Sequence, residues 1–115
     1  MKKLTAAGIK NLVVKTLKEH KANDVVALNI KELTDIADYM VICTANSTTH
    51  VKALIENTKK ELAHADIAPL GIEGEDTREW MLIDFGYVIV HVMLESVRDF
   101  YDLEKLWGFA QKTKK

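Results

Sequence analysis

The chain of 115 residues is long enough to form one domain with its own hydrophobic core, without disulfides or a structural metal. Its composition, 48% hydrophobic and 29% charged, is that of an ordinary globular protein. Sixteen basic and 17 acidic residues leave a net charge of −1, without the basic stripe typical of phosphate-driven nucleic-acid binding. We therefore expect residues 1–115 to form a single domain that makes little direct contact with nucleic acid.

Neither a membrane segment nor a signal peptide is indicated. The longest apolar run, residues 81–94, is interrupted by Asp84, Gly86 and His91 and is too short to span a bilayer. The amphipathic N-terminus is typical of a helix, and the single cysteine, Cys43, cannot form an internal disulfide. These features predict a cytoplasmic protein.

The first half of the chain predicts a helix and two strands. Thr5 is a suitable N-cap for a helix that runs to about His20. Residues 24–30 form a β-branched run that predicts a strand. Residues 38–44 are apolar at both alternating positions, which predicts a central strand covered on both faces.

A second helix should begin at Asn46 or Ser47 and end by Ile67, because Pro69 follows it. A short extended segment at residues 69–74 comes next.

The hairpin and the C-terminal helix complete the domain. Residues 80–84 and 87–93 predict two strands of a hairpin, and Ser96 is the expected N-cap of a last helix that ends at Gly108. Residues 109–115 are a basic tail that we expect to be flexible. The order α-β-β-α-β-β-β-α predicts an α/β (α+β) domain, a mixed β-sheet with packed helices.

The predicted hairpin separates its side chains into two different faces. A turn about Phe85-Gly86 places Ile83 opposite Val88 and Trp80 opposite His91. The first face is entirely apolar and belongs in the core: Met81, Ile83, Val88, Val90 and Val92. The second, which we call the mixed face, carries Trp80, Leu82, Asp84, Tyr87, Ile89, His91 and Met93. Its composition is typical of an interface centre, although cover by the C-terminal helix is the alternative.

No catalytic, cofactor-binding or metal site is evident. The four histidines, His20, His50, His64 and His91, lie on different elements without an HExxH motif. In the first turn of a helix, His50 is expected to be a neutral hydrogen-bonding group. Cys43, in a buried strand, should behave as a small apolar group.

Asp35 and Asp38 support an alternative function. Two carboxylates before a strand can hold Mg²⁺ in a nucleotidyltransferase-fold enzyme or a nucleotide-binding protein. They are three residues apart, however, and no GxxxxGK[ST] or GxGxxG loop accompanies them. Turn capping is their expected role.

Four segments, DYMVICTANSTTHV, PLGIEGE, WMLIDFGYVIVHVM and RDFYDLEKLW, resemble the ribosomal silencing factor (Iojap-like) family in order and spacing. The resemblance covers about Val25 to Trp107. It implies a nucleotidyltransferase-like fold without that fold's catalytic motif. It also implies a protein that binds the large ribosomal subunit through ribosomal protein fourteen, prevents the small subunit from joining, and represses translation when nutrients are scarce.

The family's conserved tryptophan falls on Trp80, its strand aspartate on Asp84, and its histidine on His91. With the mixed face, this predicts a partner-binding set: Trp80, Leu82, Asp84, Ile89, His91 and Met93. Ala45, Thr49 and Tyr87 differ from the residues common in the family, which affects the expected affinity more than the identity of the partner. Self-association through the same face is the third possibility, so we expect a monomer or a weak homodimer.

Overall fold

The computed structural model describes the backbone of residues 4–101 and the side chains of residues 4–98. Its elements are α1 (Ala6–Glu19), β1 (Asn23–Asn29), β2 (Tyr39–Ala45), α2 (Thr48–His64), β3 (Gly71–Glu73), β4 (Trp80–Asp84), β5 (Val88–Leu94) and α3 (Glu95–Tyr101). This order confirms the predicted one. The predicted helix end at Gly108 and the expected flexible tail lie outside the described residues. Within the described part, no helix has the length and apolar character needed to cross a membrane.

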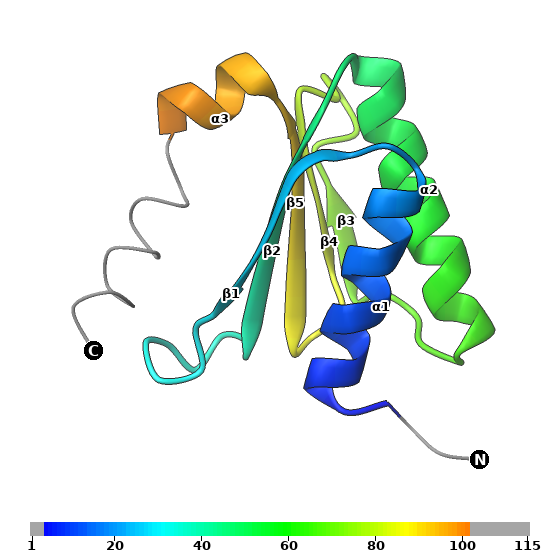
Figure 1. Ribbon diagram of the computed structural model, residues 1–115, viewed down its shortest axis with the longest axis vertical. Helices are drawn as coiled ribbons and strands as arrows, with labels where there is room; N and C mark the ends of the chain where they lie inside the picture. The colour runs from blue at the N-terminus through cyan, green and yellow to red at the C-terminus, as the bar shows by residue number, and fades with distance from the viewer. Residues whose placement is uncertain (1–3, 102–115) are drawn as a thin grey trace.

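The five strands form one mixed sheet in the order β1-β2-β5-β4-β3. The central pair, β2 and β5, is parallel, from Tyr39 opposite Val88 to Ala45 opposite Leu94, and the other pairs are antiparallel. Figure 1 shows α1 and α2 on one face of this sheet and α3 on the other side. The mixed sheet with packed helices is therefore confirmed.

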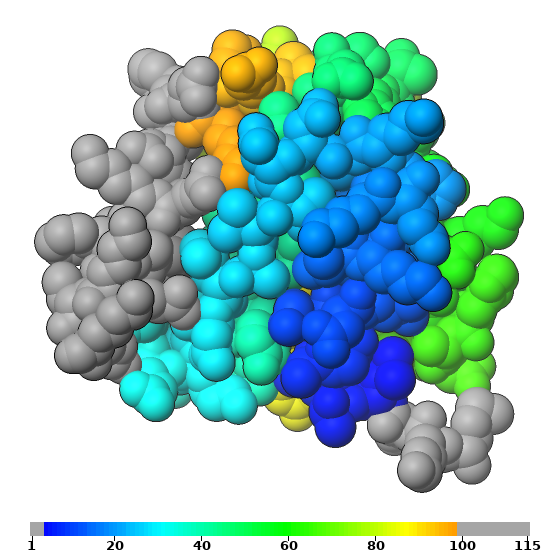
Figure 2. Space-filling view, in the orientation of Figure 1, coloured from blue at the N-terminus to red at the C-terminus, as the bar shows by residue number. Residues whose placement is uncertain are grey.

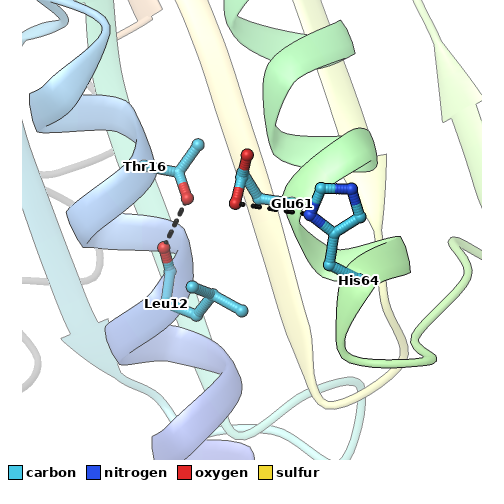
Figure 3. Close-up of polar contacts among 4 residues, drawn as sticks. All are labelled: Leu12, Thr16, Glu61 and His64. Carbon is cyan, nitrogen blue, oxygen red and sulfur yellow. Dashed lines mark hydrogen bonds and ion pairs between the residues drawn. The ribbon is translucent and has the colours of Figure 1, made fainter.

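Capping residues explain where the two long helices begin. The Thr5 hydroxyl accepts a hydrogen bond from the backbone N–H of Gly8 (3.0 Å), and the Ser47 hydroxyl accepts one from His50 (3.1 Å). On the buried face of α1, the hydroxyl of Thr16 donates to the carbonyl of Leu12 (2.8 Å; Figure 3), so this polar group is satisfied inside the core.

The main core lies between the sheet and the pair α1 and α2. The five residues predicted for the apolar hairpin face are all at most 1% exposed: Met81, Ile83, Val88, Val90 and Val92. They pack with Val13 and Leu17 of α1 and with Leu54, Ile55 and Leu62 of α2. Burial of each such side chain contributes roughly 1.5–3 kcal/mol, so this layer supplies most of the stability.

A smaller core lies on the opposite face of the sheet. It contains Leu28, Ile30, Ala37, Met40, Ile42 and Met93, with Trp80, Ile89 and Val97 packed against it. β2 therefore has apolar cover on both faces, as its sequence predicts. The loop between β1 and β2 supplies part of this cover through Ile30 and Ala37.

The last helix begins differently from the prediction. α3 starts at Glu95, directly after β5, so Ser96 lies inside the helix and the predicted N-cap is wrong. Arg98, 9% exposed, donates from Nη1 to the carbonyl of Asp24 (2.7 Å) and to the hydroxyl of Thr44 (2.8 Å). A buried guanidinium thus links α3 to the edge strand β1 and to β2. Asp24 has a φ of +49° beside an irregularity in β1, and this conformation accompanies the carbonyl contact.

The space-filling view shows the side of the molecule that α1 occupies. The N-terminal third of the chain, blue to cyan, forms most of this surface, with α2 in green along one side and the start of α3 in orange above (Figure 2). The strands β4 and β5 are largely hidden from this side, behind the helices and β1 (Figures 1 and 2).

Cys43 is expected to be chemically inert in the native protein. Its side chain is 0% exposed, and burial raises the pKa of the thiol to about 12, although the positive charge of Arg98 acts in the opposite direction. We expect no modification by an aromatic disulfide reagent at pH 8 in buffer, and complete modification in 8 M urea, measured by absorbance. Modification of the native protein at the rate of an exposed thiol would contradict this assignment.

Candidate functional site

The β4–β5 hairpin turns about Gly86-Tyr87, so the predicted turn at Phe85-Gly86 is wrong. Met81 lies opposite Val92 and Ile83 opposite Val90, which moves each predicted pair by two residues. Gly86 has a φ of +93°, a conformation that glycine adopts easily and that suits the first central position of a two-residue turn. Because side chains alternate with a period of two, this shift leaves the residues of β4 and β5 on their predicted faces. Tyr87, which was predicted to begin the second strand on the mixed face, instead lies in the turn.

The structure brings the six predicted partner-binding residues together on the mixed face. Across the two strands Trp80 pairs with Met93, Leu82 with His91, and Asp84 with Ile89. Four of these side chains are half-buried: Trp80, Leu82, Asp84 and Ile89. His91 is 9% exposed and Met93 0%. Met93 therefore lies beneath the face and offers no contact surface of its own, which corrects its expected role.

Trp80 and His91 are joined by a hydrogen bond. The indole Nε1 donates to Nδ1 of His91 at 2.9 Å, with ring centroids 5.8 Å apart and ring planes tilted by 50°. The two residues are diagonal neighbours across the strands, not the directly opposite pair that was predicted. Burial lowers the pKa of His91 to about 4, so at neutral pH the imidazole is uncharged and its Nδ1 is free to accept.

The side chain and the backbone of Asp84 both accept hydrogen bonds at the end of the hairpin. Its carboxylate accepts a hydrogen bond from the backbone N–H of Gly86 (2.7 Å), and its carbonyl accepts one from Leu70 (2.6 Å). Tyr87, the second residue of the turn, is 64% exposed beside this end of the mixed face. The carboxylate therefore contributes to the shape of the turn and also places a negative charge at the rim.

His50 and His64, both on α2, make contacts of a structural kind. Nδ1 of His50 accepts from the N–H of Asn46 and Nε2 contacts the carbonyl of His20, both at 3.0 Å, which joins the end of α1 to the start of α2. These contacts confirm the hydrogen-bonding role predicted for His50. His64 is exposed on α2, with Nδ1 3.9 Å from the carboxylate of Glu61 on the same helix (Figure 3).

Asp35 and Asp38 do not cap their turn. Asp35 is exposed, and the side chains that accept backbone N–H groups in this loop are those of Asn29 and Thr34. Asp38 contributes backbone groups, including an N–H that donates to the carbonyl of Tyr87 (2.8 Å). Among residues 4–101, no three His, Cys, Asp or Glu side chains come together as a metal would require.

One feature has no signal in the sequence. A polar pocket of about 500 Å³ lies where β2 and β5 end, lined by Asn23, Asp24, Thr44, Ala45, Asn46, Leu94, Glu95 and Ser96. Its residues come from separate segments, which the antiparallel pairing of β1 with β2 and the parallel pairing of β2 with β5 bring together. The charged side chains of this lining are carboxylates, so the pocket does not fit the phosphates of a nucleotide.

The fold and the site define a class of small α+β domains. In this class, two helices cover one face of the sheet, and the mixed face on the other side carries an indole that is oriented by a hydrogen bond. A family model described as "Ribosomal silencing factor during starvation" matches residues 3–115. A ribosomal silencing factor from Chromobacterium violaceum is 40% identical over 100 residues, which cover 87% of this chain and 82% of that protein. One from Halalkalibacterium halodurans is 42% identical over 99 residues, with 86% and 85% covered.

A solved structure supports the same relationship. The crystal structure of a Chromobacterium violaceum protein matches with a TM-score of 0.89 at 38% identity, covering 91% of this chain and 88% of that one. The chain therefore belongs to the ribosomal silencing factor family, which confirms the resemblance noted in its sequence. Membership places it among ribosome-associated regulators of translation.

Proposed function

We propose that this protein binds the large ribosomal subunit through ribosomal protein fourteen and blocks the joining of the small subunit. Translation in the cytoplasm is thereby repressed when nutrients are limiting. The observation that carries the proposal is the mixed face, on which the apolar side chains of Trp80, Leu82 and Ile89 are only half-buried. The description of the family names ribosome silencing and starvation. It therefore supports the ribosome as the target and nutrient limitation as the condition.

The chemistry of this face favours a protein partner. Trp80, Leu82 and Ile89 supply apolar area, and an indole is the side chain most often found at the energetic centre of an interface. Asp84 adds one charge at the rim. With a net charge of −1, the chain lacks the positive field by which proteins bind rRNA phosphates. His91 and Met93 support the face from below.

Repression through this face needs occupancy and bulk, and no catalytic step. The molecule measures 40 × 36 × 23 Å. A body of this size, bound at the face where the small subunit docks, leaves no room for an intersubunit contact. The helices α1 and α2, on the other side of the sheet, would then project toward the small subunit (Figure 1).

Sucrose-gradient sedimentation of separated ribosomal subunits tests the proposal. Under conditions that favour joining, the protein should reduce the peak of joined ribosomes and sediment with the large subunit. The same gradients with large subunits that lack ribosomal protein fourteen should show no bound protein. Sedimentation with the small subunit, or unchanged joining at saturating protein, would refute the proposed mechanism.

The variant Trp80→Ala is expected to lose binding while it still folds. Removal of a central aromatic side chain costs ~2 kcal/mol or more of binding, about thirtyfold in affinity. Co-sedimentation over a concentration series measures the loss, and far-UV circular dichroism checks the fold. Leu4→Ala is the matched control, since Leu4 is a partly exposed apolar residue (38%) just before α1, and it should bind as the wild type does. Wild-type affinity in Trp80→Ala would show that the mixed face is not the docking surface.

A further inference from the structure

His91 contributes little surface of its own to the mixed face. It is 9% exposed, whereas its hydrogen-bond donor Trp80 is half-buried and reaches the surface. Leu82 pairs with His91 from β4, and Ile42 pairs with it from β2. The imidazole is therefore enclosed between two neighbouring strands, and its Nδ1 lies 2.9 Å from the indole nitrogen.

We propose that His91 is a positioning residue, whose Nδ1 fixes the indole of Trp80 in the orientation that the ribosomal partner binds. This inference rests on the proposed function. It assigns the effect of His91 on docking to Trp80, and not to direct contact between the imidazole and the partner.

Positioning by His91 limits the freedom of the indole before binding. Ordering a mobile side chain at an interface weakens binding by roughly two- to twelvefold, and a side chain that is already ordered avoids this loss. A donor with one N–H and an acceptor with one lone pair fix a direction as well as a distance, and the 50° tilt between the rings excludes a parallel stack that could slide. Because the acceptor is shielded from water, water competes weakly for this bond.

Substitutions at position 91 separate positioning from contact. His91→Leu removes the acceptor and keeps an apolar side chain that fits the enclosed site. In His91→Asn, the amide oxygen stands two bonds from Cβ, at the place of Nδ1, so it can accept the same indole N–H. We expect His91→Leu to weaken binding to large subunits by up to about tenfold, because binding must then order a mobile indole, and His91→Asn to restore most of the affinity.

A double-mutant cycle with Trp80→Phe gives the decisive comparison. Phenylalanine keeps an aromatic ring and lacks the N–H, so His91→Leu should change affinity less than twofold in that background. If the partner contacted the imidazole itself, His91→Leu would instead weaken binding equally in both backgrounds.

The indole N–H resonance provides a readout that stability alone does not change. The chain has two tryptophans, so an ¹H–¹⁵N spectrum shows two indole cross-peaks, and Trp80→Phe identifies the one from Trp80. In folded His91→Leu this proton should exchange with water faster than in wild type, and in His91→Asn it should remain protected. If His91→Leu fails to fold, His91→Gln, whose amide lies one bond further out, replaces it throughout the same comparisons.

The outcomes distinguish this inference from the function on which it rests. Loss of binding in Trp80→Ala together with wild-type binding in a folded His91→Leu would overturn the positioning role and leave the docking face intact. A folded His91→Asn with a protected indole proton and no recovery of affinity would overturn it as well. Wild-type binding in Trp80→Ala would instead remove the docking face itself.

Discussion

Gly74→Ala is expected to lower the free energy of unfolding by about 4 kcal/mol and to disturb the Trp80 end of β4. Gly74 has a φ of +91°, which an L-residue adopts only with strain. A Cβ at this position would also overlap the carbonyl oxygen of Trp80 and approach Cα of Met81 to 3.0 Å. These are backbone atoms of a paired strand, so they cannot move aside as a flexible side chain would. Urea unfolding followed by circular dichroism measures the loss.

Gly71→Ala is the matched control, since Gly71 lies in the neighbouring strand β3 with no heavy atom within 4 Å of the added Cβ. It should change the free energy of unfolding by less than about 0.5 kcal/mol. Gly86→Ala isolates the backbone strain, because its φ is +93° and its nearest neighbour, Cδ1 of Leu70, is 3.5 Å away; we expect a loss of about 1–2 kcal/mol. Equal losses for Gly74→Ala and Gly86→Ala would show that the contact with Trp80 is unimportant.

Acidification is the second change with a large expected effect. Burial lowers the pKa of His91 from its ordinary 6.5 to about 4, so between these values the unfolded chain binds a proton that the folded chain does not. The contribution of His91 is therefore fully present above about pH 6.5 and is lost as the pH falls toward 4. A pKa difference of this size corresponds to a loss of about 3 kcal/mol in the free energy of unfolding. Urea unfolding at a series of pH values from 7.5 to 4 measures it.

His91→Leu serves as the control for this titration. It retains His20, His50 and His64 and every carboxylate, so the difference between the two pH profiles isolates His91. The wild type should lose stability more steeply than the variant between pH 6.5 and 4. Parallel profiles would mean that the folded protein protonates His91 as easily as the unfolded chain, which would contradict an imidazole that is enclosed and hydrogen-bonded to Trp80.

The element order could be predicted because its signals are local. Caps such as Thr5 and Ser47 mark the helix starts, and the double-sided apolar pattern of β2 identifies a central strand. The hairpin register depends on which residue takes a positive φ. The prediction centred the turn on Phe85-Gly86, whereas the chain places Gly86 first and pairs Phe85 with Val88. The faces were still right, because a shift of two preserves the alternation.

The composition of the candidate site could be predicted, but not the depth of each side chain. Period-two spacing alone put the six residues on one face. Met93 is buried because the parallel pairing of β2 with β5 places it opposite Thr44 and in one apolar cluster with Met40 and Ile42. Nothing in a linear sequence specifies that pairing. The link from Arg98 to Asp24 and Thr44, and the polar pocket near it, depend on the same long-range arrangement.

The parallel pairing of β2 with β5 also has a consequence for the biosynthesis of the protein. These adjacent strands are separated in sequence by α2, β3 and β4, and Val88, the first residue of β5, comes late in the 115-residue chain. Loop closure over such a separation is slow compared with the formation of hairpins. The nascent polypeptide thus exposes an open edge of β2 until β5 has been synthesised. We therefore expect the pairing of β2 with β5 to be a late folding event, which can occur only after β5 has left the exit tunnel.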